Sequence, residues 1–174
     1  MEIRVSNVGD HVVSSASLPK SAAGGSSSGS SAAPAAHSGP EVLQVGQPLN
    51  ISQNGGAGAT ITITHVRVTT QPADPSFGEA PQHGYYVIAT VHVTSQINGF
   101  AVNDLDFYAI ERGQQYDTGN GNSYEAVNGT PTITTTLNSG ESETGQLVYD
   151  VPHPHGTIDY APNFQGGVIA TFSF

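Results

Sequence analysis

The sequence predicts an all-β fold, an antiparallel two-sheet sandwich over residues 47–174. Short runs of alternating apolar and polar residues recur along this part of the chain, as strands with one buried face require. Turn-forming clusters separate the runs, for example NGG at Asn54 and NSGE at Asn138. No stretch repeats apolar residues at the spacing of an amphipathic helix, so a parallel sheet, which needs crossover helices, is not favoured.

The first long predicted strand, residues 59–70, changes its alternation part-way along. Ile61 and Ile63 occupy odd positions, whereas Val66 and Val68 fall on even ones. Because side chains of a strand alternate between two faces, one buried face can continue only if an extra residue is inserted. The sequence therefore predicts a bulge or twist near His65.

Five further strands follow, each with a predicted buried face. In residues 84–94 and 143–151 the inward side chains are predicted to be Tyr85, Val87, Ala89, Val91 and Val93, and then Leu147, Tyr149 and Val151. In residues 102–110 they are Leu105, Phe107 and Ala109, with Asp104, Asp106 and Tyr108 on the opposite face. Residues 131–137 are Thr-rich and predict an edge strand, and residues 167–174 bury Val168, Ala170, Phe172 and Phe174.

Two segments precede the sandwich: an N-terminal arm (residues 1–20) and a linker (residues 21–46) rich in Gly, Ser, Ala and Pro. The linker contains too little apolar surface to offset the entropy of ordering it, so we expect a flexible tether. The arm contains a short, weakly alternating apolar stretch, whose candidate partner-binding residues are Ile3, Val5, Val8, Val12 and Val13. Such a peptide can add a strand to the exposed edge of a sheet, its own or a partner's. A disordered tail fits the same residues.

Composition and charge exclude several kinds of protein. The 174-residue chain has no cysteine, which excludes disulfides, zinc sites built from cysteine and a cysteine nucleophile. Its formal net charge of −10 lies entirely after residue 40, where Arg67 and Arg112 are the only cations besides histidine, so we expect no nucleic-acid partner. No apolar run is long enough for a membrane helix. The first residues lack the pattern of a signal peptide, so we expect that the chain is not exported as written or has had its export signal replaced.

Three segments carry a motif that resembles a known family. The motif is a strand of alternating aliphatics, an Asp-Phe pair and then Gly-Glu-x-x-x-Gly-x-Leu-x-Tyr-x-Val-Pro, at Asp106, Phe107, Gly140, Glu141, Gly145, Leu147, Tyr149, Val151 and Pro152. It resembles the immunoglobulin-like domains of the DUF4352 type and, more distantly, the group of the secreted mycobacterial antigen MPT63. The resemblance implies an immunoglobulin-like sandwich on exported or lipid-anchored envelope proteins of Gram-positive bacteria. Ala23 stands where a lipid-modified cysteine would be, so the resemblance does not extend to lipid anchoring.

Few residues suggest chemistry. His153 and His155 lie two apart in an extended PHPHG segment, and two such imidazoles are candidate ligands of a transition metal. Asp117 and Glu125 flank an Asn- and Gly-rich segment, which makes them candidate calcium ligands, although the spacing of an EF-hand loop is not met. A solvated loop is the favoured explanation of both patterns. The carboxylate pairs Asp104/Asp106 and Glu141/Glu143 fit a polar sheet face better than a glycosidase site. We therefore predict no catalytic residue, no cofactor and no enzyme.

These observations favour a non-enzymatic interaction or adhesion module displayed on a bacterial cell envelope by its tether, and so an extracellular or cell-surface location. The alternative is a decoration protein on the surface of a virion or other assembly, in which the arm anchors an acidic immunoglobulin-like head. Both hypotheses predict a protein partner, bound through the arm or a sheet edge, and the second also predicts an oligomer or larger assembly. A metal-assisted hydrolase is a third hypothesis, and it requires the histidines or carboxylates to converge in a cleft.

Overall fold

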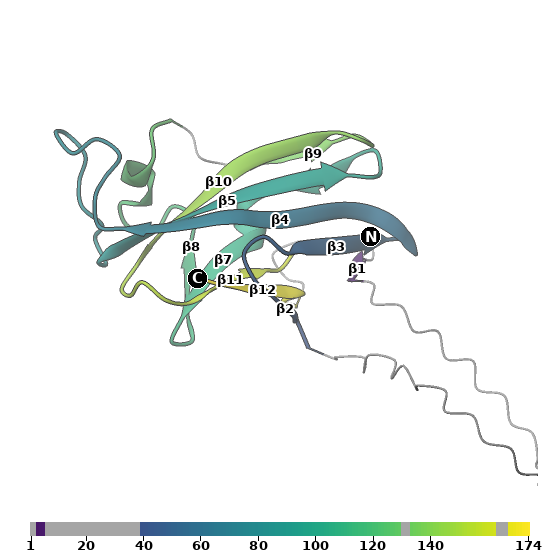
Figure 1. Cartoon of the computed structure of the whole chain (residues 1–174), viewed down its shortest axis with the longest axis horizontal. Helices are drawn as coiled ribbons and strands as arrows, with labels where there is room; N and C mark the ends of the chain where they lie inside the picture. The colour runs from purple at the N-terminus through teal and green to yellow at the C-terminus, as the bar shows by residue number, and fades with distance from the viewer. Residues whose placement is uncertain (1–2, 6–38, 130–132, 163–166) are drawn as a thin grey trace, which may run out of the picture.

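The computed structural model describes residues 3–5, 39–129, 133–162 and 167–174. Two five-stranded sheets face each other (Figure 1). The first, the β4 sheet, has the order β1 (Ile3–Val5), β3 (Pro48–Gln53), β4 (Gly56–Thr69), β5 (Tyr85–Ser95), β10 (Ser142–Val151). The second, the β7 sheet, has the order β2 (Glu41–Leu43), β12 (Ala170–Ser173), β11 (Thr157–Tyr160), β7 (Phe107–Glu111), β8 (Gln114–Asp117). The predicted all-β sandwich is confirmed.

Shorter elements complete the fold. A two-stranded sheet pairs β6 (Phe100–Val102) with β9 (Thr135–Leu137), and two 3-10 turns, η1 (Asp104–Asp106) and η2 (Ser123–Ala126), lie in the connections. Of the edge strand predicted over residues 131–137, the described part of the chain contains β9. Residues 130–132 are not among the described residues. In the described residues, no helix is long and apolar enough to cross a membrane.

The core lies between the two large sheets. Alternate side chains of the long strands meet there, and the largest fully buried ones are Leu49, Ile61, Ile63, Phe107, Leu147, Tyr149, Ile158, Tyr160 and Phe172. Phe107 and Tyr160 stack at a centroid distance of 4.7 Å across neighbouring strands. Fully burying an aliphatic or aromatic side chain contributes roughly 1.5–3 kcal/mol, so this single cluster is the main source of stability.

The bulge predicted near His65 is confirmed. The register of β4 against β5 shifts between Ile63 and His65, and beyond the shift Val66 and Val68 lie opposite Ala89 and Val87. The inserted residue returns the valines to the inner face, as the alternation requires. They are nevertheless less covered than Ile61 and Ile63, and Val68 is 37% exposed.

The predicted inward face of residues 102–110 is wrong at its first position. Leu105 is 48% exposed, and Asp106, predicted to face outward, is buried. The cause is η1: the Asn103 side chain accepts a hydrogen bond from the backbone N–H of Leu105 (3.0 Å) and starts a 3-10 turn, which breaks the two-residue alternation. From Phe107 onward β7 alternates as predicted. Tyr85, Val168 and Phe174 are only partly buried.

The folded domain begins earlier than predicted. Residues 41–46 were assigned to the linker, yet Glu41–Leu43 form β2, which pairs in parallel with β12. The domain boundary at residue 47 is therefore placed too late. The arm contributes one described strand: Ile3, Arg4 and Val5 pair antiparallel with Gln53, Ser52 and Ile51 at the edge of the β4 sheet (Figure 1).

Candidate functional site

Two connections meet at one end of the β4 sheet and form the surface that we call the loop end. They are residues 70–84, between β4 and β5, and residues 118–127, which follow β8 and include η2 (Figure 1). The Asp150 carboxylate on β10 is fully buried beneath them. It accepts hydrogen bonds from the backbone N–H groups of Gln82 (2.6 Å), His83 (2.8 Å) and Asn122 (2.9 Å). One carboxylate therefore fixes both connections to the sheet, because charge-assisted hydrogen bonds to buried amides are strong.

Further hydrogen bonds join the two connections. The Asn122 side-chain amide donates to the backbone carbonyl of Ala80 (2.9 Å), and the Glu125 carbonyl accepts from the backbone N–H of Ala73 (2.8 Å). The buried Tyr86 hydroxyl donates to the carbonyl of Glu79 (2.9 Å). Burial, together with the carboxylates of Asp150 and Glu125, raises the pKa of Tyr86 to about 12. The loop end is thus held by side chains beneath it and is preorganised.

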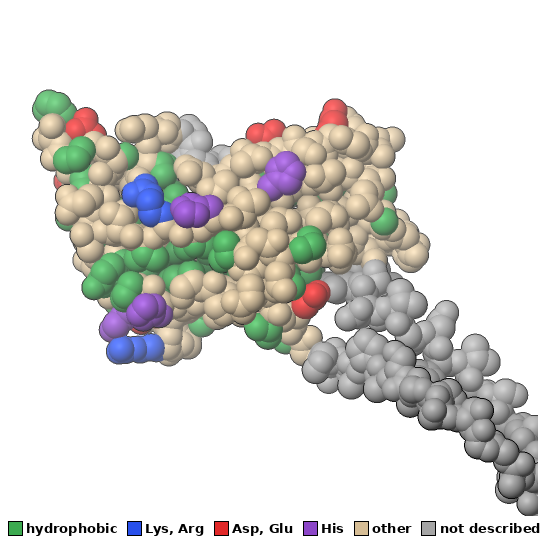
Figure 2. Space-filling view, viewed as in Figure 1, with side chains coloured by type: hydrophobic (Ala, Val, Ile, Leu, Met, Phe, Trp, Pro, Cys, Tyr) green, Lys and Arg blue, Asp and Glu red, His purple; other side chains and the backbone are tan. Residues whose placement is uncertain are grey.

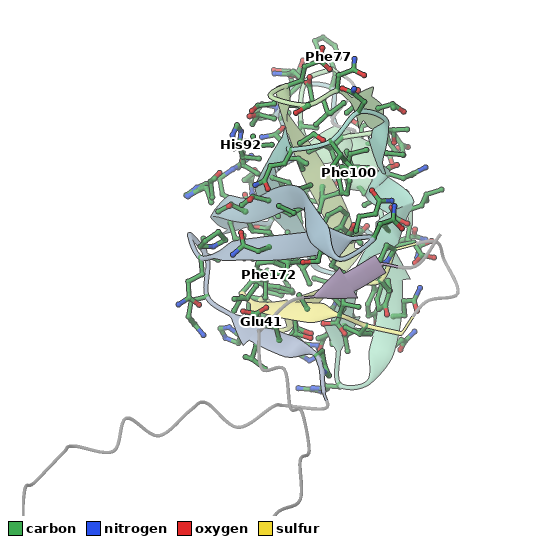
Figure 3. The ribbon with its side chains drawn as sticks, turned by 90° about the vertical axis from the view of Figure 1, so that its right-hand side faces the viewer. Glu41, Phe77, His92, Phe100 and Phe172 are labelled. Carbon is green, nitrogen blue, oxygen red and sulfur yellow. The ribbon has the colours of Figure 1, made fainter. Side chains whose placement is uncertain are left out.

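Two aromatic side chains project from this fixed surface. Phe77 is 90% exposed and Tyr124 is 61% exposed, and Figure 3 shows Phe77 at the top of the molecule, far from the core residue Phe172. Residues 70–84 and 118–127 contain three acidic residues, Asp74, Glu79 and Glu125, and no lysine or arginine. An exposed aromatic on a rigid loop is typical of a binding anchor, because it buries a large area without losing much conformational freedom.

A second buried carboxylate lies beside the β7–β8 hairpin. Glu111 Oε1 is 2.5 Å from His153 Nδ1 and 3.7 Å from Arg112 Nε, while Glu111 Oε2 has no hydrogen-bond partner among the described residues. This pair holds the segment after β10 against the hairpin. Tyr116 on β8 contacts the His83 ring edge-on (6.1 Å between centroids), and burial and the Glu111 carboxylate raise its pKa. The hairpin therefore connects to the loop end.

The structure separates the candidate metal ligands. His153 faces Glu111, whereas His155 is exposed. Asp117 accepts from the side chain of Gln115 (2.8 Å), and Glu125 lies in η2 at the loop end. In the ranges that the structure describes, no group of three or more His, Asp or Glu side chains could hold a metal ion.

The candidate partner-binding residues of the arm are only partly described. Ile3 and Val5 lie in β1, paired with β3 in the same chain. Val8, Val12 and Val13 lie outside the described residues. Binding of a partner by the arm therefore stays a prediction.

Sequence reasoning missed Asp150 and its surroundings. Alternation places Asp150 on the outer face of the β4 sheet, where a carboxylate is expected to be solvated. The loop end covers that face and buries a second, smaller apolar cluster of Tyr86, Ile88, Ala126 and Val148. The available signal was a break in the alternation: β5 and β10 have apolar residues on both faces near this end, which is typical of strands covered on both sides.

The two sheets, the core between them and the loops at one end define an immunoglobulin-like β-sandwich domain. The chain belongs to the family described as "Domain of unknown function (DUF4352)", whose family model matches residues 44–170. This confirms the resemblance that the motif indicates.

Two solved structures are similar to the chain. The secreted protein MPT63 of Mycobacterium tuberculosis is 18% identical, with a TM-score of 0.56, and the match covers 79% of this chain and 100% of that chain. The ycdA protein of Bacillus subtilis is 18% identical, with a TM-score of 0.48, and the match covers 67% of this chain and 36% of that one. No curated protein matches the chain in sequence.

Proposed function

We propose that the chain is an exported, non-enzymatic interaction module that binds a partner protein through its loop end. The observation that carries this proposal is the exposure of Phe77 and Tyr124 on loops that the buried Asp150 carboxylate fixes in place. Preorganised aromatic side chains bind with a small entropic cost, because little freedom remains to be lost. Enzymes instead converge reactive groups in a cleft, whereas two of the buried carboxylates, Asp150 and Glu111, are engaged in holding loops.

Export and display are part of the same proposal. MPT63, whose fold this chain shares, is described as a secreted protein. A cysteine-free, acidic domain suits an extracellular location, because its fold needs no disulfide and its charge disfavours aggregation. The Gly-, Ser- and Ala-rich sequence before β2 has the composition of a flexible spacer.

The test measures retention of the purified full chain on intact Gram-positive cells. We expect the double variant Phe77→Ala/Tyr124→Ala to be retained at least about tenfold less than the wild type, since anchor aromatics typically contribute 2 kcal/mol or more. Leu105→Ala is the matched control, because Leu105 is an exposed apolar residue outside the loop end. Equal retention of all three proteins, or no retention of the wild type, would overturn the proposal. If only the double variant loses retention, a photo-crosslinking residue at position 77 identifies the partner.

A second candidate function, decoration of a virion or other assembly, is favoured by β1. Ile3–Val5 supplies a strand to the edge of β3, and the same strand could be donated to β3 of a neighbouring copy. The cysteine-free chain allows a direct test, because Arg4 and Ser52 are cross-strand partners. A mixture of Arg4→Cys and Ser52→Cys chains forms an interchain disulfide only if strands exchange. Arg4→Cys mixed with Val42→Cys, an exposed site on β2, controls for random collision.

A further inference from the structure

The β4 strand is longer than the neighbour that covers its edge. β3 pairs with β4 only between Gly56 and Thr62, and one further contact follows, from the Gly46 N–H to the Ile63 carbonyl (2.7 Å). From His65 to Thr69, β4 is paired on one side alone, by β5, within the described chain. This half of the strand is the open edge. Its backbone N–H and C=O groups are a template for another strand.

Apolar side chains lie along the open edge. The turn before β3, whose Gly46 N–H donates to Ile63, contains Val45, which is 38% exposed, and Val66 and Val68 lie on the inner face of β4. Tyr85 and Phe174 are also only partly buried where they pack on the core. Figure 2 shows the result as a band of apolar side chains running beneath β4. The sandwich is therefore incompletely closed at this side, and water contacts part of its core.

The band has cationic margins, although the domain is acidic. Arginine and histidine side chains lie above it over β4 and below it near the β7–β8 hairpin, whereas acidic side chains lie at the outer parts of this face (Figure 2). The exposed basic residues of β4 are His65 and Arg67, and Arg67 makes no ion pair or hydrogen bond with any described residue. Arg112, at the hairpin, is partly compensated by Glu111. The chain has a formal net charge of −10, so the basic residues beside this band have the opposite sign to the chain as a whole.

We propose that the open edge of β4 binds an extended polypeptide segment in which apolar and acidic side chains alternate. Added as a strand beside His65–Thr69, such a segment satisfies the unpaired backbone groups. Its side chains on the inner face pack against Val66 and Val68. Those on the outer face lie next to His65 and Arg67, because paired strands place neighbouring side chains on the same face. Charge complementarity selects an acidic occupant over a basic one. This binding does not depend on the loop end.

The probe is a fluorescein-labelled synthetic peptide of alternating valine and glutamate, and fluorescence anisotropy measures its dissociation constant with the full chain. We expect Arg67→Glu to weaken binding at least about tenfold, because like charges then face each other across the added strand. Arg4→Glu makes the same change of charge on β1 and is expected to leave the constant within about twofold. A valine–lysine peptide is expected to bind at least about tenfold more weakly.

Backbone methylation separates strand addition from a purely electrostatic contact. Two further peptides carry N-methyl groups on alternate amides: the first on every valine amide, the second on every glutamate amide. Only one of these two sets of amides points toward β4, so we expect methylation of that set alone to abolish binding. Equal binding of both methylated peptides, equal binding of the valine–lysine peptide, or no binding at millimolar wild-type chain would overturn the proposal. Self-association of the wild type that Arg67→Glu removes would also overturn it, by making a second copy the occupant.

Discussion

Asp150 and Glu111 are both buried carboxylates toward the same end of the sandwich, and their surroundings differ. Asp150 accepts three backbone N–H hydrogen bonds from two separate connections. Glu111 faces one half-exposed side chain, His153, and leaves Oε2 without a hydrogen-bond partner in the described chain. Asp150 therefore determines the path of the main chain, whereas Glu111 positions a side chain that has other conformations open to it.

The comparison shows how two carboxylates with similar burial can contribute differently to the free energy of unfolding. A buried charge is costly unless hydrogen bonds replace its lost hydration. Asp150 has that replacement from rigid backbone donors, so removing it leaves three amides unpaired in a buried place. Glu111 is only partly compensated, so neutralising it relieves some of the cost that it imposes.

The largest expected effect is that of Asp150→Asn. We expect it to lower the free energy of unfolding by about 3 kcal/mol, because the amide replaces a charged acceptor and turns an NH₂ group toward backbone donors. Urea denaturation measures the change. Asp159→Asn is the matched control, since Asp159 is partly exposed on β11 and accepts from the Thr157 hydroxyl (3.0 Å). Equal losses in both variants would contradict the special role of Asp150.

Gly121→Ala tests the same site from the loop. Gly121 has a φ of +58°, and a Cβ atom added to it would overlap the Asp150 carboxylate. We expect a loss of about 2 kcal/mol, combining the left-handed backbone with displacement of the carboxylate. Gly113→Ala has a similar φ of +81° with open space around the added Cβ, and should cost about 1 kcal/mol. If thermal unfolding gives the same loss for both, Asp150 tolerates displacement.

Tyr86→Phe removes the hydrogen bond to Glu79 and should cost about 1 kcal/mol at neutral pH. The folded pKa of Tyr86 is raised from 10.0 to about 12 by burial and by Asp150. Its protonated form therefore stabilises the fold fully below about pH 10, and this contribution is lost as the pH rises toward 12. The difference in unfolding free energy between wild type and variant should shrink over that window. A constant difference would show that the pKa of Tyr86 is not raised in the folded state.

The smallest effect is expected for Glu111→Gln, below about 1 kcal/mol in either direction. Loss of the contact with His153 is offset by removal of a buried carboxylate with one oxygen that has no hydrogen-bond partner among the described residues. The ¹⁵N relaxation of the backbone amides of His153, His155 and Gly156 should nevertheless change, because the His153 side chain loses its contact with Glu111. A loss as large as that of Asp150→Asn would remove the distinction between the two carboxylates.

Alternation predicted the parts of the fold in which neighbours in sequence determine the face of each side chain. The bulge at His65 could be predicted from the sequence because Ile61 and Ile63 occupy odd positions and Val66 and Val68 even ones. The resemblance to the DUF4352 domains was readable from turn and core residues such as Gly140 and Leu147. These signals are local, and they are enough to define a sandwich.

The loop end was not predictable in this way, because its residues come together only through the tertiary fold. Nothing near Asp150 in the sequence indicates that Gln82 and Asn122 will donate to it. Leu105 was misplaced because one Asn103 side chain changed the local backbone from strand to 3-10 turn. The proximity of His153 to Glu111 likewise depends on the packing of two distant segments.

The parallel pairing of β2 with β12 has a mechanical consequence. Glu41–Leu43 form β2, and Ala170–Ser173 of β12 run beside them in the same direction. A pull applied before β2 and after β12 acts in opposite directions along two parallel strands. It therefore loads their hydrogen bonds in shear, all at once, instead of peeling them one by one.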